Sequence, residues 1–328
     1  MEQLSSLKKH INSISEIKQM TRAMELISTV KARRARSQLN KTMPFFALCA
    51  ETMVELRDAG VVINDPFFQL RQKKLGETWK IGYFILTGDQ GLAGAYNMNV
   101  VATAEHHIRD KMVDNIRKGL MTTARLFVAG SIGKERLIHA GFDVVADFRY
   151  PISEPTYYLA RDISDYIHDL YATEKLDLVY FIYTRMESAI SMKPVVTRVL
   201  PVNPDALEQV IPPEYLKRRG LVTGSSIEYL PSAEDVVNYL ITTYLNGMVY
   251  GALTEAYASE QTARMTAMDN ATESADDMLQ KLTLQNNQAR QARITSELSE
   301  IVGGAEALAD QPAQNKTEGE QSEWQQVI

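Results

Sequence analysis

Apolar side chains recur at every third or fourth position along the first part of the chain. The series is Leu4, Leu7, Ile11, Ile14, Ile17, Met20, Met24, Ile27 and Val30. This spacing places them on one face of a helix, because residues three and four apart are neighbours on a helix surface. The pattern predicts an amphipathic helix from about residue 4 toward Gly60, with a bend near Pro44.

The other end of the chain predicts a much longer helix. Residues 232–308, about 77 in all, contain no proline. A continuous helix of that length extends roughly 110 Å, whereas helices of globular proteins rarely exceed about 25 residues. A stripe of small residues steps along it by three or four: Ala252, Ala256, Ser259, Ala263, Ala267, Ala271 and Ser274. Such a stripe admits a partner helix at close range, and we expect the first helix to be that partner in a long antiparallel coiled coil.

One part of this long helix predicts a different contact. Residues 285–293 are polar on nearly every side. They have little apolar surface to bury on their own fold, so they predict a contact with another protein through hydrogen bonds and charges.

The middle of the chain has the shorter pattern of strands. Strand-like runs lie at 79–87, 125–129, 144–148, 176–183 and 195–202, and helical stretches at about 95–118, 131–141 and 155–173 separate the first four. The alternation predicts an α/β class fold, a Rossmann-like domain with a mostly parallel sheet covered on both faces.

These patterns divide the chain into five parts. We expect an N-terminal coiled-coil helix (1–60), an inserted α/β domain (75–202), a connection (203–231), a C-terminal coiled-coil helix (232–308) and a tail (309–328). The tail is rich in Gln and Glu and poor in apolar residues, which predicts disorder.

Charge and cysteine usage narrow the function. The net charge of −6 argues against a protein built mainly to coat nucleic acid, although residues 1–41 hold nine Lys or Arg against three Glu. The single cysteine, Cys49, excludes an internal disulfide and fits a reducing compartment. No apolar run reaches membrane-spanning length and no secretory signal is evident, so we place the protein in the cytoplasm.

A glycine-rich segment is the first candidate for chemistry. Gly88, Asp89, Gly91 and Gly94 lie between a strand and a helix with the spacing Gly-x-x-Gly-x-x-Gly. A dinucleotide fingerprint needs Gly-x-Gly-x-x-Gly and an acidic residue at the end of the next strand. We therefore interpret these four residues as a structural turn of the α/β domain.

No other motif predicts catalysis. The run 130–134 lacks the first glycine and the Ser or Thr of a phosphate loop, and the five histidines show no metal-ligand spacing. We predict no catalytic residue, no cofactor and no metal site. Two alternatives stay open: a nucleotide-binding α/β enzyme that uses the glycine turn, and a nucleic-acid-binding coiled-coil scaffold that uses the basic N-terminal helix.

Several segments resemble one family. Residues 258–272 (Ala-Ser-Glu-Gln-Thr-Ala-Arg-Met-Thr-Ala-Met-Asp-Asn-Ala-Thr) and 287–305 closely resemble the C-terminal helix of the gamma subunit of F-type ATP synthase. Residues 17–24 are similar to its N-terminal helix, and residues 88–97 to the start of its α/β domain. The similarity covers residues 4–308. This chain departs from the family at Ala93, where a cysteine is frequent, and in its polar tail.

The resemblance implies a central rotor shaft without a catalytic site. The coiled coil would enter the ring of alpha and beta subunits, and the α/β domain, as a foot, would contact the epsilon subunit and the membrane ring of c subunits. One copy per complex would couple ion flow to ATP synthesis or hydrolysis, as a peripheral protein on the cytoplasmic face of a bacterial inner membrane. The residues that match the family's contacts with a beta subunit are Arg290, Gln291, Thr295 and Met24.

Overall fold

The computed structural model describes residues 2–58, 66–148, 150, 154–186, 191–203, 230 and 232–309. Its elements are α1 (Glu2–Asp58), β1 (Thr78–Leu86), α2 (Tyr96–Arg117), β2 (Met121–Ala129), α3 (Ser131–His139), α4 (Tyr157–Ala172), β3 (Leu178–Met186), β4 (Met192–Leu200) and α7 (Ala233–Ala309). The chain forms two compact units: one joins the residues up to Thr21 with those from Ala271 on, and the other is Arg22–Asn270. Of the predicted connection and tail, only Asn203, Leu230 and Ala309 are among the described residues.

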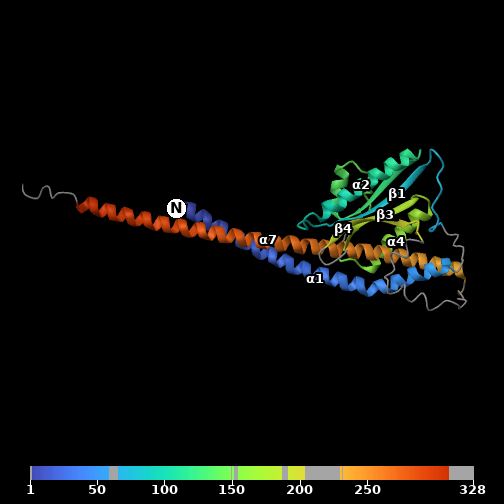
Figure 1. Cartoon of the computed structure of the whole chain (residues 1–328), viewed down its shortest axis with the longest axis horizontal. Coiled ribbons are helices and arrows are strands. Elements are labelled where there is room, and N and C mark those ends of the chain that lie inside the picture. Colours follow the sequence, from blue (N-terminus) through green and yellow to red (C-terminus); the bar gives the residue numbers. More distant parts are fainter. Residues whose placement is uncertain are drawn as a thin grey trace, which may run out of the picture. The chain divides into compact units, whose positions relative to one another are not determined.

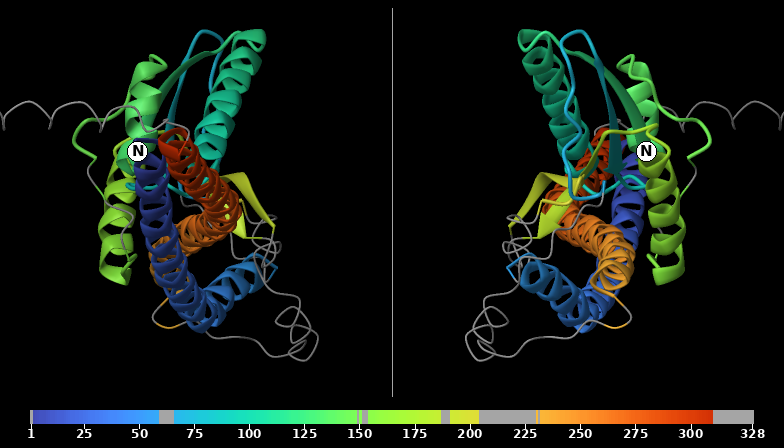
Figure 2. Two further views of the ribbon diagram at one scale, coloured as in Figure 1. Left: turned by 90° about the vertical axis from the view of Figure 1, so that its left-hand side faces the viewer. Right: turned by 90° about the vertical axis from the view of Figure 1, so that its right-hand side faces the viewer.

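α1 and α7 run antiparallel, as predicted. In the first unit, Thr21 Oγ1 and Thr272 Oγ1 share a buried hydrogen bond of 2.7 Å, and Lys18 Nζ lies 2.5 Å from Asp276 Oδ1. α1 continues as a helix through Pro44 and bends in its second half (Figure 2).

A glycine lets the two helices approach in the second unit. A Cβ on Gly247 of α7 would overlap the ring of Phe46 of α1. Gly247 therefore makes room for an aromatic ring between the helices and leaves α7 unbroken.

The sheet has the strand order β2-β1-β3-β4. β1 pairs in parallel with β2 and β3, and β4 is antiparallel to β3. Phe127, Phe84 and Phe181 stand opposite one another on the three parallel strands, with ring centroids 4.5 Å and 5.3 Å apart. Stacked cross-strand aromatic pairs stabilise such a register.

Helices cover both faces of the sheet, as predicted (Figure 1). α2 packs on one face, where Val100, Ala104 and Ile108 join the core residues Ile81 and Ile85 of β1. α4 and α7 lie on the other face, in the core that contains the three phenylalanines. The side chains of β1 are thus buried on both sides, which accounts for the nearly continuous apolar run of that strand.

Two predictions about the elements were wrong. The run 144–148 is not a strand, because it makes only an isolated bridge between Val144 and Leu126. Phe148 instead packs edge-on against Phe84 and Phe127, with centroids 5.6 Å and 5.7 Å away. Its apolar character serves the aromatic core.

The other error concerns the face of α1. The first part of the predicted stripe and Met24 are half-buried (Leu4, Leu7, Ile11, Ile14 and Met24), but Ile17, Met20, Ile27 and Val30 are 47%, 63%, 56% and 66% exposed. The buried positions of this part of α1 are the small residues Thr21, Ser28, Ala32 and Ala35.

Among the described residues, no helix combines the length and apolar character required to cross a membrane.

Candidate functional site

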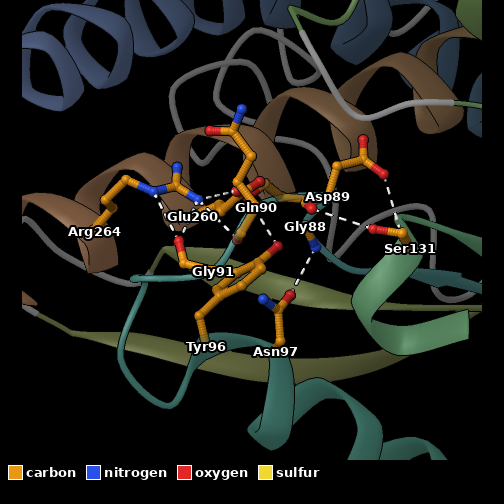
Figure 3. A network of polar contacts seen from close by, with 10 residues as sticks. Gly88, Asp89, Gln90, Gly91, Tyr96, Asn97, Ser131, Glu260 and Arg264 are labelled. Atoms are coloured by element: carbon orange, nitrogen blue, oxygen red, sulfur yellow. Dashed lines mark hydrogen bonds and ion pairs between the residues drawn. The ribbon is translucent and has the colours of Figure 1, made fainter. Parts of the chain in front are cut away.

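The glycine turn that follows β1 lies directly against α7 (Figure 3). The Gly88 N–H donates to Asn97 Oδ1 at 2.7 Å, which ties the turn to the first residues of α2. A Cβ on Gly88 would lie 2.7 Å from the carboxyl carbon of Glu260, so a larger residue there would push this carboxyl group aside. Gly94 has a φ of +55°, in the left-handed region that favours glycine.

A buried arginine of α7 holds the outer part of this turn. Arg264 Nη2 donates to the carbonyl oxygens of Gln90 at 3.0 Å and Gly91 at 3.2 Å, and Nε donates to Gly91 at 3.3 Å. The same Nη2 lies 2.6 Å from Glu260 Oε1, one helical turn earlier. Arg264 and Glu260 are 3% and 4% exposed, so both charges are buried and paired. We refer to Arg264, Glu260 and the carbonyls of Gln90 and Gly91 as the Arg264 cluster.

Burial shifts the pKa values of two groups in this region. Burial raises the pKa of Glu260, and the hydrogen bond and charge of Arg264 oppose the rise. Burial and the nearby Glu260 also raise the pKa of Tyr96. The phenol therefore keeps its proton and donates to the Ala256 carbonyl oxygen at 3.0 Å, a second bond between the α/β domain and α7.

A third bond involves the small-residue stripe of α7. Ser259 Oγ donates to the Thr184 carbonyl oxygen of β3 at 3.0 Å. The expectation that this stripe receives α1 was therefore wrong at Ser259, which faces the sheet.

The side chains of Asp89 and Thr87 occupy the backbone donors that a phosphate would need at the start of α3. The Ser131 N–H at the start of α3 donates to Asp89 Oδ1 at 3.0 Å, and the Gly133 N–H donates to Thr87 Oγ1 at 3.2 Å. These are the kind of helix N-terminal donors that bind phosphate in nucleotide sites. Since protein oxygens already accept from them, the geometry favours a structural turn.

We accordingly expect the purified chain to bind neither ATP nor NAD. Titration calorimetry of the full-length chain with each nucleotide checks this expectation. Saturable binding in the micromolar range would contradict it and revive the nucleotide-binding alternative.

The four predicted contact residues lie elsewhere on the long helices. Arg290, Gln291 and Thr295 of α7 are exposed, and Thr295 Oγ1 donates to the Gln291 carbonyl oxygen at 3.0 Å. Met24 of α1 is half-buried and belongs to the other compact unit.

The described residues contain no group of His, Cys, Asp or Glu arranged to hold a metal ion.

Sequence reasoning assigned no role to Glu260, Arg264 or Tyr96. The available signal was a pair of opposite charges four residues apart, each directly after a residue of the small-residue stripe of α7. A charged pair beside a stripe that must be buried predicts a polar partner there.

Comparisons with known proteins give the family. A family model described as ATP synthase matches residues 3–308. The ATP synthase gamma chain of Ruminiclostridium cellulolyticum is 42% identical over 305 residues, which cover 93% of this chain and 98% of that one. This chain belongs to the ATP synthase gamma family. The gamma chain of Acetivibrio thermocellus is 38% identical over 308 residues, or 94% and 100% of the two chains.

A solved structure confirms the predicted fold. A chain in the mitochondrial ATP synthase of Euglena gracilis, from a structure of OSCP, F1 and the c-ring, aligns with a TM-score of 0.55 at 16% identity, over 97% of this chain and 99% of that one. The gamma chain is the central-stalk rotor of ATP synthase and a non-catalytic subunit of the complex, as the sequence predicted.

Proposed function

We propose that this gamma chain turns inside a ring of alpha and beta subunits and meets that ring through exposed apolar surfaces on both long helices. The observation that carries the proposal lies on α7. Ile294, Leu298, Ile301 and Val302 follow one side of the helix and are 49%, 58%, 68% and 56% exposed. Large apolar side chains gathered on one exposed stripe are typical of a surface that a partner covers.

The polar contact residues accompany this stripe. Arg290 precedes Ile294 by one helical turn, and Gln291 and Thr295 follow next to them in sequence. All three are exposed and able to bond to a beta subunit while the apolar stripe packs. A guanidinium and an amide side chain together offer several directed donors, which suits a contact that must form at a defined angle.

α1 supplies the second surface. Leu26, Ile27 and Val30 are 55%, 56% and 66% exposed, whereas the neighbouring small residues Ser28 and Ala32 are buried. The small residues thus serve the fold and leave the large apolar ones for a partner. Met24 lies in the same turn, which supports its assignment as a contact with a beta subunit.

The α/β domain and the two long helices have different proposed partners. The chain is part of the membrane-associated ATP synthase. Within it, the α/β domain (75–202) is the foot that contacts the epsilon subunit and the c ring, and the helices 1–60 and 232–308 form the shaft. One copy per complex, peripheral on the cytoplasmic face, couples ion flow to catalysis in the ring. The c-ring in the Euglena structure supports this arrangement.

Co-expression tests the proposed function. The chain is produced with the alpha and beta subunits, and complexes are purified by an affinity tag on beta. We expect a stable complex with ATPase activity only when all three subunits are present. Full activity in a complex of alpha and beta alone, or failure of the chain to join them, would contradict the proposal.

The polar contact residues give a sharper prediction. We expect Arg290→Ala combined with Gln291→Ala to lower ATPase turnover of the complex at least about tenfold. A hydrogen bond to a charged group contributes about 1.5–3 kcal/mol, and about 1.4 kcal/mol is tenfold in rate. Turnover is measured on purified complexes of equal subunit content.

Gln288→Ala is the matched control, because it removes an exposed amide side chain from the same segment of α7. We expect nearly wild-type turnover from this variant. Equal turnover in the double variant and the control would rule out Arg290 and Gln291 as the contact.

A further inference from the structure

The α/β domain is joined to α7 by two different kinds of contact. The first is mainly apolar: many α7 residues between Val237 and Ala258 belong to the core that also contains Phe181 and Tyr183 of β3, although Glu255 in this stretch also pairs with Arg185 of β3 at 3.7 Å. The second is polar. Ser259 bonds to β3, Arg264 bonds to the glycine turn and is paired with Glu260 within α7, and the Tyr96 hydroxyl bonds to the Ala256 carbonyl oxygen.

The two contacts resist different motions. Apolar burial is non-directional, so it opposes separation of the domain from the helix more than it opposes rotation about the helix axis. Hydrogen bonds require a narrow range of angles, and a guanidinium bonded to several oxygens fixes its partners in direction as well as distance. The Arg264 cluster thus constrains the angle that the apolar contact leaves freer.

We propose that the Arg264 cluster is the torsional joint of the rotor, the contact that fixes the angle of the α/β domain about α7 and passes torque between them. Arg264 and Glu260 act as positioning residues. The inference rests on the proposed rotary function. It adds which residues hold the α/β domain at a fixed angle on α7.

Three features suit the cluster to this task. Arg264 reaches carbonyl oxygens of two successive residues, so the turn cannot slide along α7 without breaking both bonds. Both charges are almost wholly buried, which weakens screening by water and salt. The Tyr96 hydroxyl bonds to the α7 backbone at Ala256, two turns from Arg264, so the domain is held at two separate levels of the helix.

The test measures twist in the intact complex. Beta subunits are fixed to a surface, and a bead is attached to the α/β domain through a cysteine at the exposed position Thr123, in a Cys49→Ala background. The angular variance of the bead during pauses reports the stiffness between domain and shaft. We expect Arg264→Ala to raise this variance by roughly twofold or more, since hydrogen bonds to charged groups are the stronger kind.

Further variants keep the test decisive. Arg264→Lys keeps the charge but loses the planar fork, so it should raise the variance less than Arg264→Ala. Tyr96→Phe removes only the hydroxyl bond to the Ala256 carbonyl oxygen. If the arginine variants fail to assemble, this variant should still raise the angular variance. Arg109→Ala is the control: its guanidinium pairs with Glu105 four residues away, at 3.4 Å, on the exposed surface of α2.

The outcomes separate the two proposals. In vesicles, ions pumped per ATP hydrolysed should fall in the Arg264 variants while hydrolysis by the detached catalytic complex is retained. Wild-type variance and pumping in the Arg264 and Tyr96 variants, in complexes that rotate, would overturn the joint and leave the rotary function intact. A wild-type complex that hydrolyses ATP without rotating the bead would contradict the proposed function itself.

Discussion

Gly130→Ala is expected to destabilise the α/β domain by more than about 4 kcal/mol, a loss of stability that few single substitutions cause. Gly130 has a φ of +90°, and a Cβ there would overlap the backbone carbonyl oxygen of Thr87. Neither atom can move away cheaply, because the Thr87 N–H and Oγ1 both donate to the Ala129 carbonyl oxygen, each at 2.9 Å. The substitution therefore combines backbone strain with a clash between main-chain atoms.

Gly141→Ala is the matched control. Gly141 has a nearly equal φ of +84°, but a Cβ there would meet nothing within 4 Å. It isolates backbone strain, which costs about 1–2 kcal/mol. Urea unfolding of the full-length chain is followed by the fluorescence of Trp79, in a Trp324→Phe background that leaves it the only tryptophan. Equal midpoints for the two alanine variants would show that the contact at Gly130 carries no cost.

Periodicity predicted which residues form helices and strands better than it predicted what their faces touch. The three-and-four spacing located α1, yet Ile27 and Val30 are exposed and Ser28 and Ala32 are buried. A hydrophobic pattern shows that a face avoids water, and it does not show whether the cover is the chain itself or another subunit. Small residues carry little hydrophobic signal, although they decide where two helices approach closely.

The candidate site shows the same limit over a longer range. The glycine spacing was sufficient to interpret Gly88 to Gly94 as a turn. It could not show that Arg264, 173 residues from Gly91, bonds to that turn. Such a contact depends on the docking of the α/β domain on α7, a tertiary event that local pattern does not encode. Asp89 was likewise predicted as a turn residue, and its bond to the start of α3 emerged only with the fold.

The buried carboxylate of Asp177 provides the second large effect, and Asp177→Asn is expected to destabilise the chain by about 3 kcal/mol. Asp177 lies just before β3 and is 2% exposed. Its Oδ1 lies 3.2 Å from Arg71 Nη1, and its Oδ2 lies 2.9 Å from Lys73 Nζ and accepts from the Lys80 N–H at 2.9 Å. An amide cannot balance the two cations, which would be left beside an uncharged group.

The pH dependence identifies the cause. Burial disfavours the ionised form of Asp177, but hydrogen bonds from Lys73, the Lys80 N–H and Arg71 prevail and lower its pKa. A lowered folded-state pKa contributes stability that is complete above the usual aspartate value of about 3.9 and is lost as pH falls through the folded value. The difference in unfolding free energy between wild type and Asp177→Asn should therefore be constant near neutral pH and shrink below about pH 4.

Asp114→Asn is the control for this measurement. Asp114 pairs with Arg117 at 3.7 Å on the surface, and their side chains are 57% and 75% exposed. An exposed pair of this kind contributes about 0–1 kcal/mol, so this variant should stay close to wild type at every pH. If Asp177→Asn also unfolded at the wild-type urea concentration at neutral pH, the ion pairs with Arg71 and Lys73 would contribute no net stability. The cost of burying the Asp177 carboxylate would then have to be offset by the hydrogen bond from the Lys80 backbone N–H alone.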